Sequence, residues 1–409
     1  GIDNNLSLEG KRKEIQRSKY GVSENRSKLL PQINAIAGYS NNFDPPVSVT
    51  DGSSYGVPYN ITQTLQHSAN AGLEMQMPLF NQTLYTSMSI AKVMEEISRL
   101  SYGKAREDVI LQISKMYYLG QVTAEQIMLI KANITRLEEL RDITQAFFDN
   151  GMSMEVDLKR VNINLENLKV QYDNAQAMMK QQLNMLKYIM DYPAEKEIAL
   201  TPVNTDSITT VALTGLSENI YELQLSQSQV QLAERQKKII TNGYIPSLSL
   251  TGSWRYAAYT DKGYHWFHSG PSNQWFRSYG VGLTLRIPIF DGLDKTYKIK
   301  KAMIDIENKR LAWEDARKNL QTQYLNAVND LMNNQRNFKK QKDNYLLAED
   351  VYAVTSDRYR EGIASMTEVL QDEMQMSEAQ NNYISAHYNY RVTNLMLLKL
   401  TGQIESLVK

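Results

Sequence analysis

The side chains with the most suggestive spacing for chemistry are His265 and His268, which lie three residues apart. On a helix, that spacing places two imidazoles on one face, where they could bind a metal ion. No third ligand is evident nearby, and the chain contains 0 cysteines. Trp266 and Phe267 separate the two histidines, so we interpret this segment as an aromatic surface loop and predict neither a metal nor any other cofactor.

The sequence also lacks the common signatures of catalysis. It has no phosphate-binding glycine loop, nucleophile elbow or paired-carboxylate motif. His67 and His387 are isolated in the sequence. The formal net charge of +0 argues against a nucleic-acid partner. We therefore predict that the chain is not an enzyme and binds no nucleic acid.

Three charged residues, Glu74, Arg255 and Arg286, fall on the polar side of segments in which apolar and polar residues alternate. Strands of about ten residues with one apolar and one polar face are typical of transmembrane β-barrels, although soluble sandwiches show the same alternation. Four such strands cannot close a barrel, and an open sheet in lipid would leave its edges unsatisfied. Either the strands form a small soluble sheet, or several chains each contribute four strands to one barrel whose lumen these charges line.

The strands belong to a duplication that covers nearly the whole chain. Long helical segments that follow Gly151 and Gly362 carry apolar residues in the same heptad frame, which is typical of side-by-side helices. The first repeat, residues 1–203, should contain an N-terminal helix, strands at about 32–42 and 67–79, and helices at about 81–149 and 153–190. The second, residues 204–409, should contain a helix at about 215–241, strands at about 245–259 and 278–289, and helices at about 292–360 and 363–401.

The longest helical segment of each repeat has no proline over about 70 residues and would extend roughly 100 Å. Such a helix is longer than a compact domain of this size and needs neighbours along its length. A closed ring of helices shared among subunits would supply them. The first residues, GIDNNLSLEGKR, have the pattern of a helix interior, so we expect the first part of that helix to be missing.

The ordered, duplicated set of motifs resembles the TolC-type outer membrane efflux channel family over essentially the whole chain. The motifs are LLPQINAIAGY and GYIPSLSLTGSW, the strand ends MPLF and IPIF, and the turns NGMSMEVDL and EGIASMTEVL. The resemblance implies an α+β membrane protein that forms a homotrimer. Each protomer would give four strands to one twelve-stranded transmembrane β-barrel, continuous with a long periplasmic α-helical barrel.

The resemblance also implies a location and partners. The barrel would lie in outer-membrane lipid of a Gram-negative bacterium, with the helical part in the periplasm. A periplasmic adaptor, or membrane fusion protein, and an inner-membrane efflux pump of the RND or ABC type would dock at the helical tips. The residues that this family position assigns to adaptor docking are Gly151, Met152, Gly362 and Ile363.

Members of the family carry an acidic residue six positions beyond each tip glycine, which corresponds to Asp157 and Glu368 here. A second acidic position of better-known members is occupied by Gln371. Three copies would turn each carboxylate into a ring that selects ions at the periplasmic gate. The alternative is that both are first-turn acids favoured by the helix dipole. Basic residues close enough in sequence to form gate salt bridges are Arg160, Arg358 and Arg360.

The function that follows is a passive exit duct across the periplasm and outer membrane for drugs or other small molecules, driven by an inner-membrane pump through its adaptor. A type I secretion duct for proteins or peptides is an alternative within transport. A coiled-coil scaffold that transports nothing is the alternative from another class.

Overall fold

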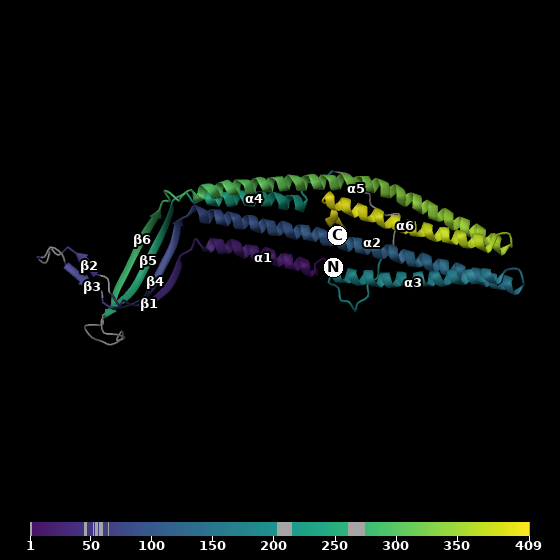
Figure 1. Cartoon of the computed structure of the whole chain (residues 1–409), viewed down its shortest axis with the longest axis horizontal. Coiled ribbons are helices and arrows are strands. Elements are labelled where there is room, and N and C mark those ends of the chain that lie inside the picture. The colour runs from purple at the N-terminus through teal and green to yellow at the C-terminus, as the bar shows by residue number, and fades with distance from the viewer. Residues whose placement is uncertain are drawn as a thin grey trace. The chain divides into compact units, whose positions relative to one another are not determined.

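The computed structural model describes residues 2–44, 47–51, 53, 56, 60–63, 65–202, 215–260 and 275–408. Two halves follow one another with the same order of elements, namely a helix, strands, a very long helix and a shorter helix (Figure 1). In the first half these are α1 (Leu6–Ser27), β1 (Gln32–Asn41), β2 (Val47–Thr50), β3 (Asn60–Gln63), β4 (His67–Phe80), α2 (Gln82–Asp149) and α3 (Glu155–Ile189). In the second they are α4 (Tyr221–Asn242), β5 (Ser247–Thr260), β6 (Trp275–Arg286), α5 (Asp294–Arg360) and α6 (Met366–Leu400), before the short 3₁₀ helix η2 (Ile404–Val408).

The observed bounds differ from the expected ones at several places, including the starts of β6 at Trp275 and of α6 at Met366. The segment between the two expected strands of the first repeat contains the hairpin β2–β3, in which Val47 pairs with Gln63. Strand β6 ends at Arg286 rather than at about 289, because Pro288 has no N–H to donate to a ladder. Helix α4 begins at Tyr221 rather than at about 215, since Gly215 has a φ of 93, outside the helical region.

The chain divides into two compact units, and each takes segments from both halves. One unit comprises Gly1–Ile15, Ile97–Gln227 and Arg310–Lys409, and the other Gln16–Glu96 and Ser228–Lys309. The second unit contains an antiparallel sheet with strand order β1-β4-β5-β6. Strands β1 and β6 are the edges of that sheet. Backbone groups on the outer side of each edge strand are therefore available to a further strand.

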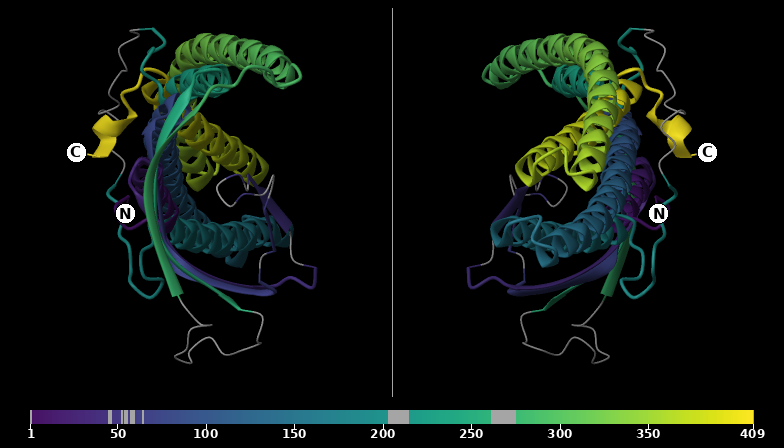
Figure 2. Two further views of the ribbon diagram at one scale, coloured as in Figure 1. Left: turned by 90° about the vertical axis from the view of Figure 1, so that its left-hand side faces the viewer. Right: turned by 90° about the vertical axis from the view of Figure 1, so that its right-hand side faces the viewer.

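The first unit is built from α2, α3, α5 and α6 running side by side (Figure 1). Leu137 of α2 and Val161 of α3 are buried in one apolar cluster together with Tyr352 of α5 and Val369 of α6. Seen along the helices, α3 and α5 lie on the two outer sides of α2 and α6 (Figure 2). Among the helices of the described residues, none is long and apolar enough to cross a bilayer.

Candidate gate and pore surfaces

The turn between α2 and α3 is a Schellman motif built on Gly151. The Gly151 N–H donates to the Phe148 carbonyl at 2.9 Å, and the Met152 N–H donates to the Phe147 carbonyl at 2.7 Å. Gly151 has a φ of 72, a left-handed conformation that glycine adopts without steric cost. This pattern ends α2 sharply and sends the chain back along it.

The turn between α5 and α6 repeats that geometry. The Gly362 N–H donates to the Tyr359 carbonyl at 2.9 Å, and the Ile363 N–H donates to the Arg358 carbonyl at 2.8 Å. Gly362 has a φ of 76. Ile363 and Met152, the residues after the two glycines, are both exposed. Each hairpin tip therefore presents an apolar side chain to solvent directly after its glycine.

Glu368 lies in a capping box at the start of α6. Its carboxylate accepts from the Ser365 N–H at 2.7 Å, while the Ser365 hydroxyl oxygen accepts from the Glu368 N–H at 3.3 Å. These hydrogen bonds with Ser365, aided by the charge of Arg358, lower the pKa of Glu368 below its ordinary value. Glu368 thus stays ionised and also stabilises the helix end.

Asp157 occupies the corresponding position of α3, but its contacts differ. The residue before α3 is Met154, which offers no side-chain cap. Asp157 instead forms an ion pair with Arg160 at 3.4 Å. Arg160 also donates to the Thr367 hydroxyl at 3.2 Å. One arginine therefore joins the acid of α3 to the first turn of α6.

Of the remaining gate candidates, Arg358 acts on Glu368 through its charge, whereas Arg360 is paired with other acids. Arg360 contacts Asp357 and Glu139, each at 3.5 Å. Gln371 is exposed on the next turn of α6. Within one copy, the tip therefore holds two separate arrangements, the Asp157–Arg160 pair and the Arg360 pairs.

The three charged strand residues share the polar face of the sheet. Glu74 is in register with Ser253, and Arg255 lies two residues further along β5. Their side chains form an ion pair. Arg286 of β6 pairs with Ser247 at the other end of β5, in the neighbouring β5–β6 ladder. The fold brings Glu74 and Arg255 together and keeps Arg286 apart from them.

Two buried acids were not predicted from the sequence. Glu373 of α6 and Glu107 of α2 are both 4% exposed, and burial raises the pKa of each to about 7. The sequence pattern that could have identified Glu373 is a polar residue at every seventh position along the buried face of α6, which we call the polar stripe. These residues are Glu373, Gln380, His387 and Asn394.

The structure gives this polar stripe partners on α2. The Asn133 amide donates to the Gln380 side-chain oxygen at 2.7 Å. The Tyr383 hydroxyl donates to Glu125 at 2.9 Å, and the same carboxylate lies 3.3 Å from Nδ1 of His387. Because hydrogen-bonded polar groups pair only in one alignment, they fix the register of α6 on α2.

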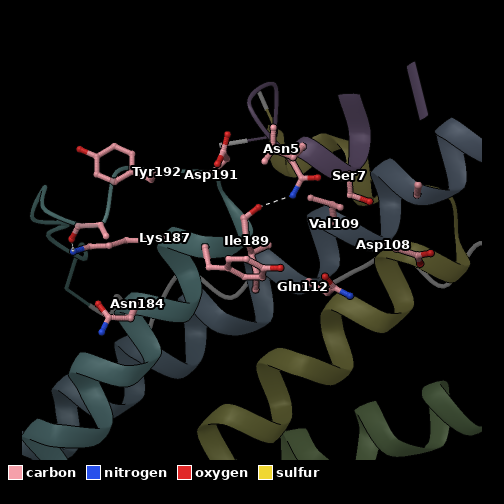
Figure 3. A pocket seen from close by; sticks show the side chains of 14 residues that line it. Asn5, Ser7, Asp108, Val109, Gln112, Asn184, Lys187, Ile189, Asp191 and Tyr192 are labelled. Carbon is pink, nitrogen blue, oxygen red and sulfur yellow. Dashed lines mark hydrogen bonds between the residues drawn. The ribbon is translucent and has the colours of Figure 1, made fainter. Parts of the chain in front are cut away.

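A separate hollow of ≈ 700 Å³ lies where α1 begins, beside the end of α3 (Figure 3). The Asn5 amide crosses it to donate to the Ile189 carbonyl at 2.6 Å. Lys187 is already bound to the Ala194 carbonyl at 2.8 Å. The hollow contains none of the sequence-derived site residues and presents no convergent charged groups.

The expected aromatic loop with His265, Trp266, Phe267 and His268 lies outside the described residues. In the described part of the chain, no three His, Asp or Glu side chains are grouped to hold a metal ion.

The fold, with four strands leading into long helical hairpins in a duplicated chain, defines an outer membrane channel of the TolC type. The sequence profile described as "Outer membrane efflux protein" matches residues 2–190 and 212–403, and the chain belongs to this family. It is an outer membrane efflux channel of Gram-negative bacteria, and its family consists of channels and not of enzymes.

Individual relatives agree with this assignment. The chain is 21% identical to the outer membrane protein TolC of Vibrio cholerae serotype O1 over 399 residues, covering 94% of this chain and 84% of that protein. It is 23% identical to the toluene efflux pump outer membrane protein TtgC of Pseudomonas putida over 379 residues, covering 88% of this chain and 75% of that protein.

Solved structures share the fold. CusC superposes with a TM-score of 0.81 at 16% identity, covering 98% of this chain and 90% of that chain. VceC of Vibrio cholerae superposes with a TM-score of 0.77 at 14% identity, covering 98% and 94% of the two chains.

Proposed function

We propose that three copies of this chain assemble into an exit duct for drugs or other small molecules. Their sheets close into a twelve-stranded barrel in the outer membrane, and their helices form a tube in the periplasm. A periplasmic adaptor docks at the helical tips and couples the duct to an inner-membrane pump. The observation that carries this proposal is that the sheet and the helical unit each have two unpartnered sides. In the sheet these sides are edge strands, and in the helical unit they are helix faces with exposed apolar residues.

In the sheet, the open sides are the edge strands β1 and β6. The apolar face of β6 is unprotected, with Val281 80% and Leu283 67% exposed. A sheet with open edges cannot remain in lipid, because backbone groups without partners are costly there. Pairing β6 of one copy with β1 of the next would satisfy the edges and close a ring.

In the helical unit, the open sides are the outer faces of α3 and α5. Each carries exposed apolar residues at spacings close to a heptad, which is the pattern of a coiled-coil seam. On α3 they are Val156, Ile163, Val170, Met178 and Met185. On α5 they are Leu311, Leu325, Met332, Leu346 and Val354. We propose that α3 of one copy packs against α5 of the next.

Cysteine cross-linking tests this assembly, because the chain has 0 cysteines of its own. Val170 and Leu346 belong to these two sets, are both exposed and lie at similar distances from the tip glycines. Oxidation of the Val170→Cys, Leu346→Cys variant should produce covalent dimers and trimers. Within one copy α2 and α6 separate the two helices, so an internal disulfide is not expected. Each single variant is the control, and monomers alone from the double variant would refute the seam.

The acids and arginines near the tips support a gate in this duct. Threefold copies of Asp157 and Glu368 would form rings of negative charge, with Gln371 adding none. Arg160 and Arg360 would restrain the tips through their ion pairs, and Arg358 through its charge near Glu368. The Asp157→Ala, Glu368→Ala variant should show altered conductance or ion selectivity in a planar bilayer. Unchanged conductance and selectivity would refute the gate.

The exposed tips support adaptor docking. Gly151 and Gly362 each require a positive φ, and Met152 and Ile363 present apolar side chains next to them. Bulky substitutions at both glycines should distort the turns and abolish drug export in a strain that depends on this channel, while trimers still assemble. Intact export with distorted tips would exclude them as the docking surface.

The small-molecule cargo is supported by the named functions of relatives. An antibiotic efflux pump outer membrane protein and a toluene efflux pump outer membrane protein of Pseudomonas putida are each 23% identical to this chain. Drug and solvent susceptibility of a deletion strain carrying this chain tests the cargo. Restored secretion of a protein without restored resistance would favour the secretion duct.

A further inference from the structure

One hollow in the polar face of the sheet contains an ion pair among neutral groups. The hollow has a volume of ≈ 490 Å³ and includes Glu74 and Arg255. Its other polar side chains are uncharged, and two glycines of β6 leave it open on one side. These residues are Asn34, Gln76, Thr251, Ser253, Gly280 and Gly282.

Gly72 explains how Arg255 lies in this hollow. The two residues are in register on β4 and β5. A Cβ atom built on Gly72 would lie 2.4 Å from the Trp254 carbonyl oxygen and 3.0 Å from Cγ of Arg255. The missing side chain lets the aliphatic part of Arg255 lie against β4. The guanidinium is thereby directed along β4 to Glu74.

The pair contributes little to stability. The Arg255 and Glu74 side chains are 47% and 40% exposed, and ion pairs as open as this are worth about 0–1 kcal/mol. A charge on the wall of a narrow pore, in contrast, acts strongly on passing ions, because walls of low dielectric focus its field. The consequence of the pair should therefore be found in transport.

We propose that Glu74 positions and neutralises Arg255, and that this pair makes the barrel at its level tolerant of cargo of either charge sign. The inference rests on the proposed trimeric channel, in which the polar face lines the lumen. Each Glu74 carboxylate holds an Arg255 guanidinium against the sheet and cancels its charge. Without Glu74, three free guanidinium groups would form a cationic ring at this level.

The test measures the local potential in the assembled trimer with charged thiol reagents. Ser253→Cys places a single thiol in register with Glu74, in a chain with 0 cysteines of its own. Its modification rate is measured with an anionic sulfonate and with a cationic trimethylammonium methanethiosulfonate. The ratio of the two rates reports charge sign and cancels changes in thiol reactivity, which affect both reagents equally.

Adding Glu74→Gln should raise the ratio of anionic to cationic rates. A unit charge about 7 Å away in water changes each rate about threefold, so the ratio should change roughly sevenfold. Arg255→Gln should lower the ratio by a similar factor, and the double variant should restore it.

A thiol from Thr284→Cys is the matched control, since it is four residues along β6 from Gly280, which pairs with Ser253. That is roughly 13 Å, beyond the screening length of about 10 Å at 0.1 M salt.

Two results would overturn the inference in different ways. A labelled thiol whose ratio is the same with and without Glu74 would refute the role of the pair and leave the channel intact. A thiol from Ser253→Cys that neither reagent labels, while one from Val281→Cys on the opposite face is labelled, would show that the polar face does not line water. That result would refute the proposed barrel as well.

Discussion

Because of Glu373, the free energy of unfolding of the helical unit should fall as pH rises. Its side chain lies on the buried face of α6 and is 4% exposed, and its Oε1 atom accepts no hydrogen bond within the described residues. Burial and the charge of Glu373 both raise the pKa of Tyr352 of α5. The nearby Arg136 and Glu349 are already paired with each other. Burial therefore raises the pKa of Glu373 from 4.5 to about 7.

The sign and size follow from proton linkage. When the folded pKa of an acid lies above its unfolded value, the unfolded state loses its proton first, so stability falls as pH rises between 4.5 and about 7. Above this pH range, the free energy of unfolding is lower by a constant amount of about 3 kcal/mol. Between pH 5 and pH 8 the difference is about 2.5 kcal/mol for this one side chain.

Hydrogen exchange of peptides from the first half of α6 measures this effect, because it reports the free energy of local opening. After correction for intrinsic exchange, the protection contributed by Glu373 should fall about 70-fold between pH 5 and pH 8. Glu373→Gln and Glu373→Met should both remove this contribution, whatever their effect on absolute stability. Glu378→Gln is the matched control, since Glu378 is exposed on the same helix.

The reasoning would be refuted if the wild-type chain and both Glu373 variants lost protection equally with pH. Such a result would mean that water reaches the Glu373 carboxylate in the folded state, either directly or after a conformational change. Glu107→Gln provides an independent check, because burial also raises the pKa of Glu107 to about 7. The effect of Glu107→Gln on the pH dependence of protection should be seen in peptides from the middle of α2, and it should add to the effect of the Glu373 variants.

Three further predictions concern local geometry. Ser365→Ala removes the capping box, so it should destabilise the start of α6 by about 1 kcal/mol in exchange and let the pKa of Glu368 rise toward its ordinary value. Asp191→Gly should raise the melting temperature, because Asp191 has a φ of 48, which costs non-glycine residues about 1 kcal/mol. Gly72→Ala should lower trimer yield through its clash with the β5 backbone, whereas Gly280→Ala, whose Cβ has no neighbour closer than 4.0 Å, should not.

Local and periodic features could be read from the sequence. The duplication, the strand alternation and the glycine at each hairpin tip depend on residue types at fixed spacings. Those spacings impose backbone conformation directly, as the two Schellman turns at Gly151 and Gly362 show. The pattern Ser365-x-x-Glu368 is also legible in the sequence as a capping box, which agrees with the alternative that Glu368 is a first-turn acid of its helix.

Contacts between distant segments were decided only by the tertiary structure. Arg160 reaches Thr367 because the two hairpin tips lie together, and no spacing in the sequence encodes that contact. Glu74 and Arg255 meet because β4 pairs with β5, in a register to which the close approach at Gly72 contributes. Periodicity placed Glu373 on one stripe of α6, but its pKa depends on the side chains that exclude water from it. The sequence therefore determined the elements and their faces, while the packing of α2, α5 and α6 determined which charges are paired and which are buried alone.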